Sequence, residues 1–159
     1  MNDSWDSFAG ALQEEADALG RVEDAALRLT QSLVNNDIAS ITLTERELDG
    51  ARRAYITASG KRRGMQVRGF GTMTLRQVCA YAPRRLSLSL NQRLSELATR
   101  SIGLGITNNN NKALIAAGLQ RLFKVTAALQ QAASDQPKTY KRRGFIPPPT
   151  NSVLVSSQA

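Results

Sequence analysis

Few side chains in this chain are suited to catalysis, and none has a suitable partner nearby in the sequence. Histidine is absent, which removes the commonest general base and the commonest metal ligand. Cys79 is the only cysteine, so neither an intrachain disulfide nor a thiolate metal cluster can form. We expect Cys79 to pack as a small apolar residue beside Val78. Glu14 and Glu15 are adjacent, so their side chains diverge on a helix, and a solvated acidic face is expected there.

Two glycine-containing segments fall short of nucleotide-binding loops. Gly69-Phe70-Gly71 lacks the third glycine and the preceding strand of a dinucleotide loop, and Ser59-Gly60-Lys61 lacks the Walker spacing. We therefore predict that the chain is not an enzyme and that it needs no cofactor and no catalytic metal.

The formal net charge of +8 is unevenly distributed along the chain. Residues 1–50 hold 11 acidic and 3 basic residues, whereas residues 51–159 hold 2 acidic and 18 basic residues. Such a split is typical of a surface for nucleic acid or an acidic partner, but it also fits two helices that attract each other within a hairpin. The basic runs at 61–63 and 141–143 could neutralise phosphates, although no aromatic ladder accompanies them.

Hydrophobic periodicity predicts helices along most of the chain. A helix is expected over residues 4–35, where apolar residues form a heptad seam with Glu15 as its one polar position. The seam residues are Trp5, Phe8, Leu12, Leu19, Val22, Ala26, Leu29 and Leu33. Asn35-Asn36-Asp37 then predicts a turn or a new cap. A thinner stripe of Ile41, Leu48 and Tyr55 predicts a second helix over about 38–59, ended by Gly60.

The segment 60–72 has several glycines and basic residues, which predicts a loop. A short helix capped by Thr72 or Thr74 should follow, and Pro83 should separate it from a long helix over about 83–133. Gly103, Gly105 and residues 108–111 are poor helix formers. The heptad phase is the same before and after them, so we predict one helix with a kink at most.

These elements predict an all-α fold: an elongated antiparallel helical hairpin or coiled-coil-like bundle of three main helices. Residues 1–133 form the helical domain, and the Pro-rich, basic residues 134–159 form a disordered tail. The first residues are polar and acidic, unlike an export signal, and no apolar stretch is long enough to span a membrane. A cytoplasmic location is therefore expected.

The segment 108–122 is the most informative one for binding. Asn108 and Asn111 lie on the seam of the long helix, where a buried asparagine can fix register or partner choice. The apolar stripe continues through Leu114, Ile115, Leu119 and Leu122. Such a stripe is more often core than binding surface. A bundle of two or three long helices is nevertheless too thin to cover every stripe, so part of this one should remain for a partner.

This order of features resembles the FlgN family of flagellar export chaperones over residues 8–144. The most specific element is Asn108-x-x-Asn111-x-x-Leu114-Ile115-x-x-Gly118-Leu119, in which Gly118 replaces the small polar residue of the family pattern. Leu75-Arg76-Gln77-Val78 before Pro83 also fits. So does the element formed by Thr139, Tyr140 and Gly144.

The resemblance implies a cytoplasmic chaperone without a cofactor. Such chaperones bind the C-terminal segments of the hook–filament junction proteins, prevent premature assembly and deliver their clients to the flagellar type III export apparatus. By matching positions, Asn108, Asn111, Leu114, Ile115 and Leu119 would lie on the client-binding helix, and Tyr140 would dock on the export gate. The apolar stripe adds Leu122 to the predicted client-binding residues. Two alternatives remain: a basic nucleic-acid-binding helical protein and a self-associating structural coiled coil.

Overall fold

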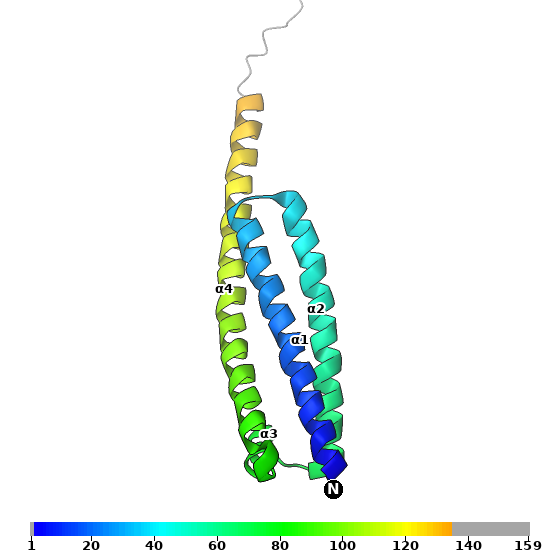
Figure 1. Cartoon of the computed structure of the whole chain (residues 1–159). Coiled ribbons are helices and arrows are strands. Elements are labelled where there is room, and N and C mark those ends of the chain that lie inside the picture. Colours follow the sequence, from blue (N-terminus) through cyan, green and yellow to red (C-terminus); the bar gives the residue numbers. More distant parts are fainter. Residues whose placement is uncertain (1, 135–159) are drawn as a thin grey trace, which may run out of the picture. The chain divides into compact units, whose positions relative to one another are not determined.

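The computed structural model of this protein describes residues 2–134, and every regular element among them is an α-helix (Figure 1). The helices are α1 (Asn2–Val34), α2 (Ile38–Phe70), α3 (Leu75–Ala80) and α4 (Arg84–Ser134). The predicted all-α fold with three long helices is confirmed, and none of these helices has the length and apolar character needed to cross a membrane. The chain divides into two compact units, residues 1–121 and 122–159. Apart from Ser134, the predicted tail lies outside the described residues.

The segment between α1 and α2 contains both the turn and the helix cap that its sequence predicts. Asn36 adopts a positive φ of 52°, which reverses the chain, and Asp37 is the N-cap of α2. The Ser40 hydroxyl donates to Asp37 Oδ2 at 2.6 Å, and the Ser40 backbone N–H donates to Oδ1 at 3.1 Å. These hydrogen bonds hold the pKa of Asp37 below its ordinary value. α1 and α2 therefore form an antiparallel hairpin.

The predicted loop over residues 60–72 is wrong for most of its length. α2 continues through Gly60 to Phe70 and ends at Gly71, whose φ of 64° and ψ of −130° form a backbone conformation that glycine adopts readily and other residues rarely adopt. The helix persists because this segment packs against α1: Arg62 is buried there. Tertiary contacts thus outweigh the low helix propensity of the glycines.

Two ion pairs between α1 and α2 join the acidic N-terminal part of the chain to the basic part that follows it. Lys61 Nζ lies 2.7 Å from a carboxylate oxygen of Glu14, and Arg62 Nε lies 2.7 Å from one of Glu15. A third pair nearer the turn, Arg28–Glu47 at 3.2 Å, has the opposite polarity, with its base on α1 and its acid on α2. The solvated face expected at Glu14 and Glu15 is wrong for Glu15, which is only 3% exposed. The acidic first helix and the basic second helix thus attract each other across the hairpin.

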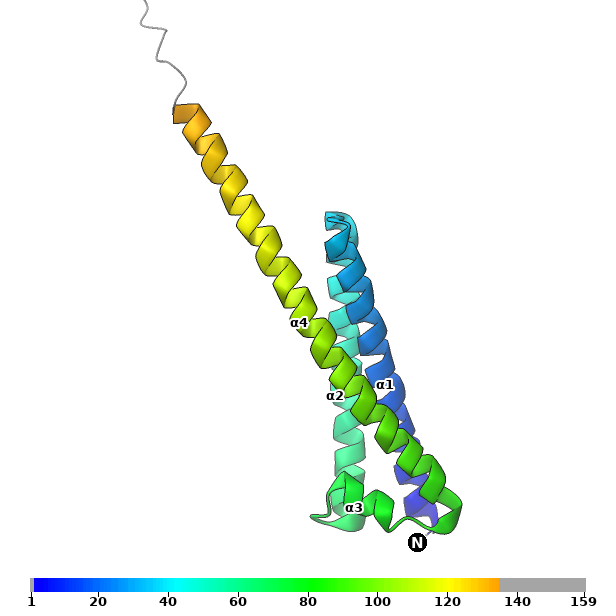
Figure 2. The same ribbon diagram turned by 90° about the vertical axis from the view of Figure 1, so that its left-hand side faces the viewer.

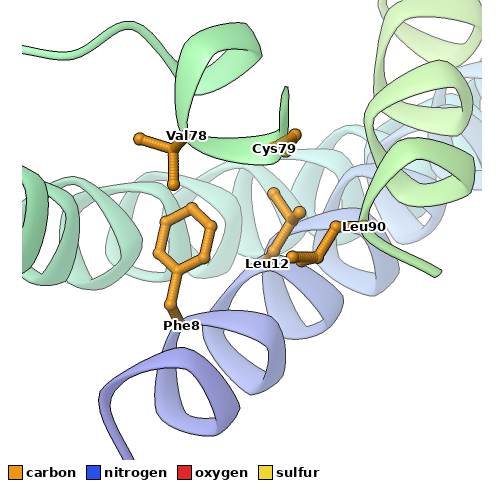
Figure 3. Packing of buried hydrophobic residues seen from close by; sticks show 5 residues of the cluster. All are labelled: Phe8, Leu12, Val78, Cys79 and Leu90. Atoms are coloured by element: carbon orange, nitrogen blue, oxygen red, sulfur yellow. The ribbon is translucent and has the colours of Figure 1, made fainter. Parts of the chain in front are cut away.

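A buried apolar cluster joins the start of α1 to α3 and α4 (Figure 3). It contains Phe8, Leu12, Val78, Cys79 and Leu90, all at most 1% exposed. The N-cap of α3 is Thr74, one of the two predicted candidates, and it forms a complete capping box with Gln77. The Phe8 and Phe70 rings meet nearly edge to face, with centroids 5.2 Å apart, so the end of α2 contacts the same cluster.

The burial of Cys79 makes its thiol a reporter of folding. Desolvation raises the pKa of the Cys79 thiol, with a smaller opposing effect from the Arg62 charge. We therefore expect native protein to react with a thiol reagent far more slowly than urea-unfolded protein, because both access and thiolate fraction are low. Rapid reaction of the native protein, at the rate of a small free thiol, would contradict this packing.

Within the first unit, α4 runs in the same direction as α1, and its axis is tilted against the hairpin (Figure 2). The contacts between α1 and α4 follow the same order along both helices. Arg85 pairs with Asp6 at 2.9 Å, Arg100 pairs with Glu23 at 3.4 Å, and Asn111 bonds to Thr30 at 2.7 Å. Gly103 and Gly105 do not break α4.

One of these glycines has a packing reason. A Cβ at position 103 would come within 3.2 Å of Glu23 Oε1, so the absence of a side chain there leaves room for the Glu23 carboxylate that Arg100 binds. A small residue is therefore favoured at position 103, although a shift of the Glu23 carboxylate by a few tenths of an ångström would admit alanine.

Candidate functional site

A cleft of ≈ 460 Å³ opens among α1, α2 and α4 in the first unit. Its apolar wall comes from Leu29 of α1, Leu48 of α2 and Ile115 of α4. The remaining lining residues are polar or charged: Glu45, Arg52, Asn108, Asn111 and Lys112. Three of the residues that the sequence predicts for client binding, Asn108, Asn111 and Ile115, thus line one cleft. The arrangement suits recognition of a surface with apolar and polar groups.

Asn111 lies at the inner end of this cleft and is only 5% exposed. Its Nδ2 donates to the Ala26 carbonyl at 3.1 Å, and its Oδ1 accepts from the Thr30 hydroxyl at 2.7 Å. Both polar atoms are therefore bonded inside the chain, which leaves one N–H and one lone pair of the amide for a further partner. The client contact expected of Asn111 stays a prediction. The placement also fits the register role that a seam asparagine can have, because the amide ties α4 to one turn of α1.

Beyond Asn111, the apolar side chains of α4 become progressively more exposed. Leu114 is half-buried, Ile115 is 39% exposed and Leu119 is 50% exposed. Ile115 and Leu119 are four residues apart, so they share one face of the helix. The apolar wall of the cleft therefore continues along α4 by one turn to Leu119.

The described part of the second unit is the C-terminal portion of α4, residues 122–134. None of the side chains in this portion is buried. Leu122, Phe123, Val125 and Leu129 are all more than half exposed. An apolar stretch of helix that buries no side chain against its own chain is a candidate surface for a partner.

Sequence reasoning missed the part of the site that α1 and α2 provide. Thr30 lies off the heptad seam, and nothing in the sequence pairs it with Asn111, which lies 81 positions away. Leu29 and Leu48 do lie on predicted apolar stripes. Those stripes could have indicated that both residues face α4. Tyr140, the predicted docking residue, lies outside the described residues. Within residues 2–134, no three His, Cys, Asp or Glu side chains come together as metal ligands.

Three comparisons of this chain with known proteins found no relative. A scan against protein-family models, a search of curated proteins and a search of solved structures each returned no match.

Proposed function

We propose that this chain is a cytoplasmic export chaperone that holds an amphipathic segment of a client protein against α4. In its finer form, the proposal follows the sequence resemblance to the FlgN family. The clients are then the C-terminal segments of hook–filament junction proteins, which the chaperone keeps from premature assembly and delivers to the flagellar type III export apparatus. Tyr140 is the proposed contact with the export gate.

The observation that carries the proposal is the cleft with its apolar continuation along α4. A client helix that binds in a groove places apolar anchors at i, i+3 or i+4, and i+7. The wall formed by Leu29, Leu48 and Ile115 offers a place for one anchor, and Leu119 offers the next, one turn along α4. Asn108, half-buried on the same wall, can hydrogen-bond to a polar group of the client.

The exposed helix of the second unit supports the same role. Leu122, Val125 and Leu129 follow steps of three and four residues, so they form one apolar stripe on the helix. Because no described residue of this unit is buried, the stripe is available to a partner. Folding of a disordered client onto such a helix lowers the net affinity, which suits a protein that must release its client.

The ion pairs of the described residues weaken the nucleic-acid alternative. Lys61 and Arg62, which could otherwise neutralise phosphates, are paired with Glu14 and Glu15. Self-association through the stripe at the end of α4 remains the second alternative, and it predicts a stable homo-oligomer in sedimentation with the stripe at its interface.

The test is Leu119→Ala, measured with a labelled peptide from the C-terminal segment of a junction protein. Truncation of a half-exposed leucine that the client covers should weaken peptide binding about five- to tenfold, with little change in melting temperature. Leu27→Ala is the matched control, because Leu27 of α1 is 52% exposed and lies outside the cleft lining. Equal affinities for both variants and the unmodified chain, or no peptide binding at all, would refute the proposed client site.

A further inference from the structure

One end of the first unit carries positive charge that no described carboxylate neutralises. Residues 61–95 contain eight Lys or Arg and no Asp or Glu. Four of the eight are paired, three with carboxylates of α1 and one with Glu96 of α4. Among the described residues, the other four form no ion pair: Arg63, Arg68, Arg76 and Arg84.

Three segments of this stretch meet around the same apolar cluster. Phe70 of α2, Leu75 of α3 and Leu86 of α4 all pack against its buried members. The Gln66 side chain also donates to the Met73 carbonyl, which ties α2 to the segment before α3. The end of α2, all of α3 and the start of α4 therefore form one end of the unit, where Figure 1 shows α3.

The side chains that point outward at this end have the composition of a protein interface. Val67 is 66% exposed, Met73 is 41% exposed and Tyr81 is 72% exposed. They alternate along the chain with the exposed Arg68, Arg76 and Arg84. Arginine, tyrosine and methionine are enriched where proteins bind each other. We call these six residues the basic end.

We propose that the basic end docks on an acidic surface of another protein, and this proposal does not depend on the client site. Arginine guanidinium groups bind carboxylates with paired hydrogen bonds, so unpaired arginines favour a partner rich in Asp and Glu. Val67 and Met73 distinguish a protein from a nucleic acid, because phosphates match the arginines but leave these apolar side chains without a partner.

The basic end and the cleft can be occupied at the same time. Arg84 is at the start of α4, and Asn108, in the cleft, is 24 residues further on, which corresponds to about 36 Å along the helix axis. A client in the cleft therefore leaves the basic end accessible. A protein with two such surfaces can hold one partner while it docks on a second.

The experiment uses the full chain and three labelled probes in fluorescence anisotropy at two salt concentrations. The first is a helical peptide with glutamates flanking a leucine stripe, the second has lysine in place of each glutamate, and the third is a short DNA duplex. We expect the acidic peptide to bind most tightly and to weaken with salt. Arg76→Glu with Arg84→Glu should reduce its affinity at least about tenfold. Binding of the junction-protein peptide at the cleft should remain unchanged.

The matched control is Arg21→Glu with Arg46→Glu, which changes the charge equally at exposed positions of α1 and α2 away from the basic end. It should change the affinity for the acidic peptide less than about twofold. Equal losses in both double variants would show a general charge effect and overturn the proposal. So would absence of acidic-peptide binding, or a preference for the DNA duplex that Arg76→Glu with Arg84→Glu abolishes. Because client binding is measured separately, these outcomes leave the proposed function intact.

Discussion

Replacement of Arg62 by alanine is expected to lower the free energy of unfolding by about 3–5 kcal/mol. The Arg62 guanidinium donates to both carboxylate oxygens of Glu15, at 2.7 and 3.1 Å, and also to the Gln66 side chain. Glu15 is 3% exposed, so loss of Arg62 would leave a buried carboxylate without its partner. Urea denaturation followed by circular dichroism measures the effect.

Lys61→Ala is the control for this result, because the neighbouring Lys61–Glu14 pair joins the same two helices but is about half exposed. Exposed pairs contribute less than about 1 kcal/mol, so a small loss is expected. Glu15→Leu combined with Arg62→Leu should recover most of the stability, since both charges are then removed together. Similar losses from Lys61→Ala and Arg62→Ala would contradict the distinction between the two pairs.

Replacement of Leu90 by alanine should lower the free energy of unfolding by about 2–5 kcal/mol. Leu90 is 1% exposed and packs with Phe8 and Leu12 of α1 and with Val78 of α3. The substitution leaves a cavity where three helices meet, and these side chains cannot all move in to fill it. Thermal and urea unfolding both report the change.

Leu88→Ala controls for every effect of the substitution except burial. Leu88 lies on the same helix two residues earlier and is 72% exposed, so the small gain in helix propensity that alanine brings is comparable at both positions. A change within about 0.5 kcal/mol is expected. If Leu90→Ala were as mild as Leu88→Ala, the cluster would not be the core that joins α4 to the hairpin.

Hydrophobic periodicity predicts the long helices because each apolar seam depends only on residues that are close together in the sequence. The seam from Trp5 to Leu33 and the constant phase on both sides of Gly103 are properties of the order of residues alone, and each corresponds to an observed helix. Thr74 is likewise a local signal, since its capping box involves residues only three apart.

The features that sequence reasoning missed depend on partners far away in the chain. Residues 60–70 look like a loop until Arg62 is placed beside Glu15, 47 positions earlier. The sequence likewise predicts a solvated Glu15, because its partner Arg62 is too far away in the chain to be recognised. The surroundings of Asn111 are also non-local, because its hydrogen-bond partner Thr30 lies 81 positions earlier in the chain.

The equal length of α1 and α2 constrains how this molecule can change during evolution. Each has 33 residues, so the chain returns to its starting end before α4 begins beside α1. Loss of seven residues from α2 alone would displace α3 by about 10 Å, well beyond side-chain contact distance, and would separate Val78 from Phe8. Insertions and deletions in the two helices should therefore occur together. Residues 122–134, which bury no described side chain, are free of this constraint and can vary in length.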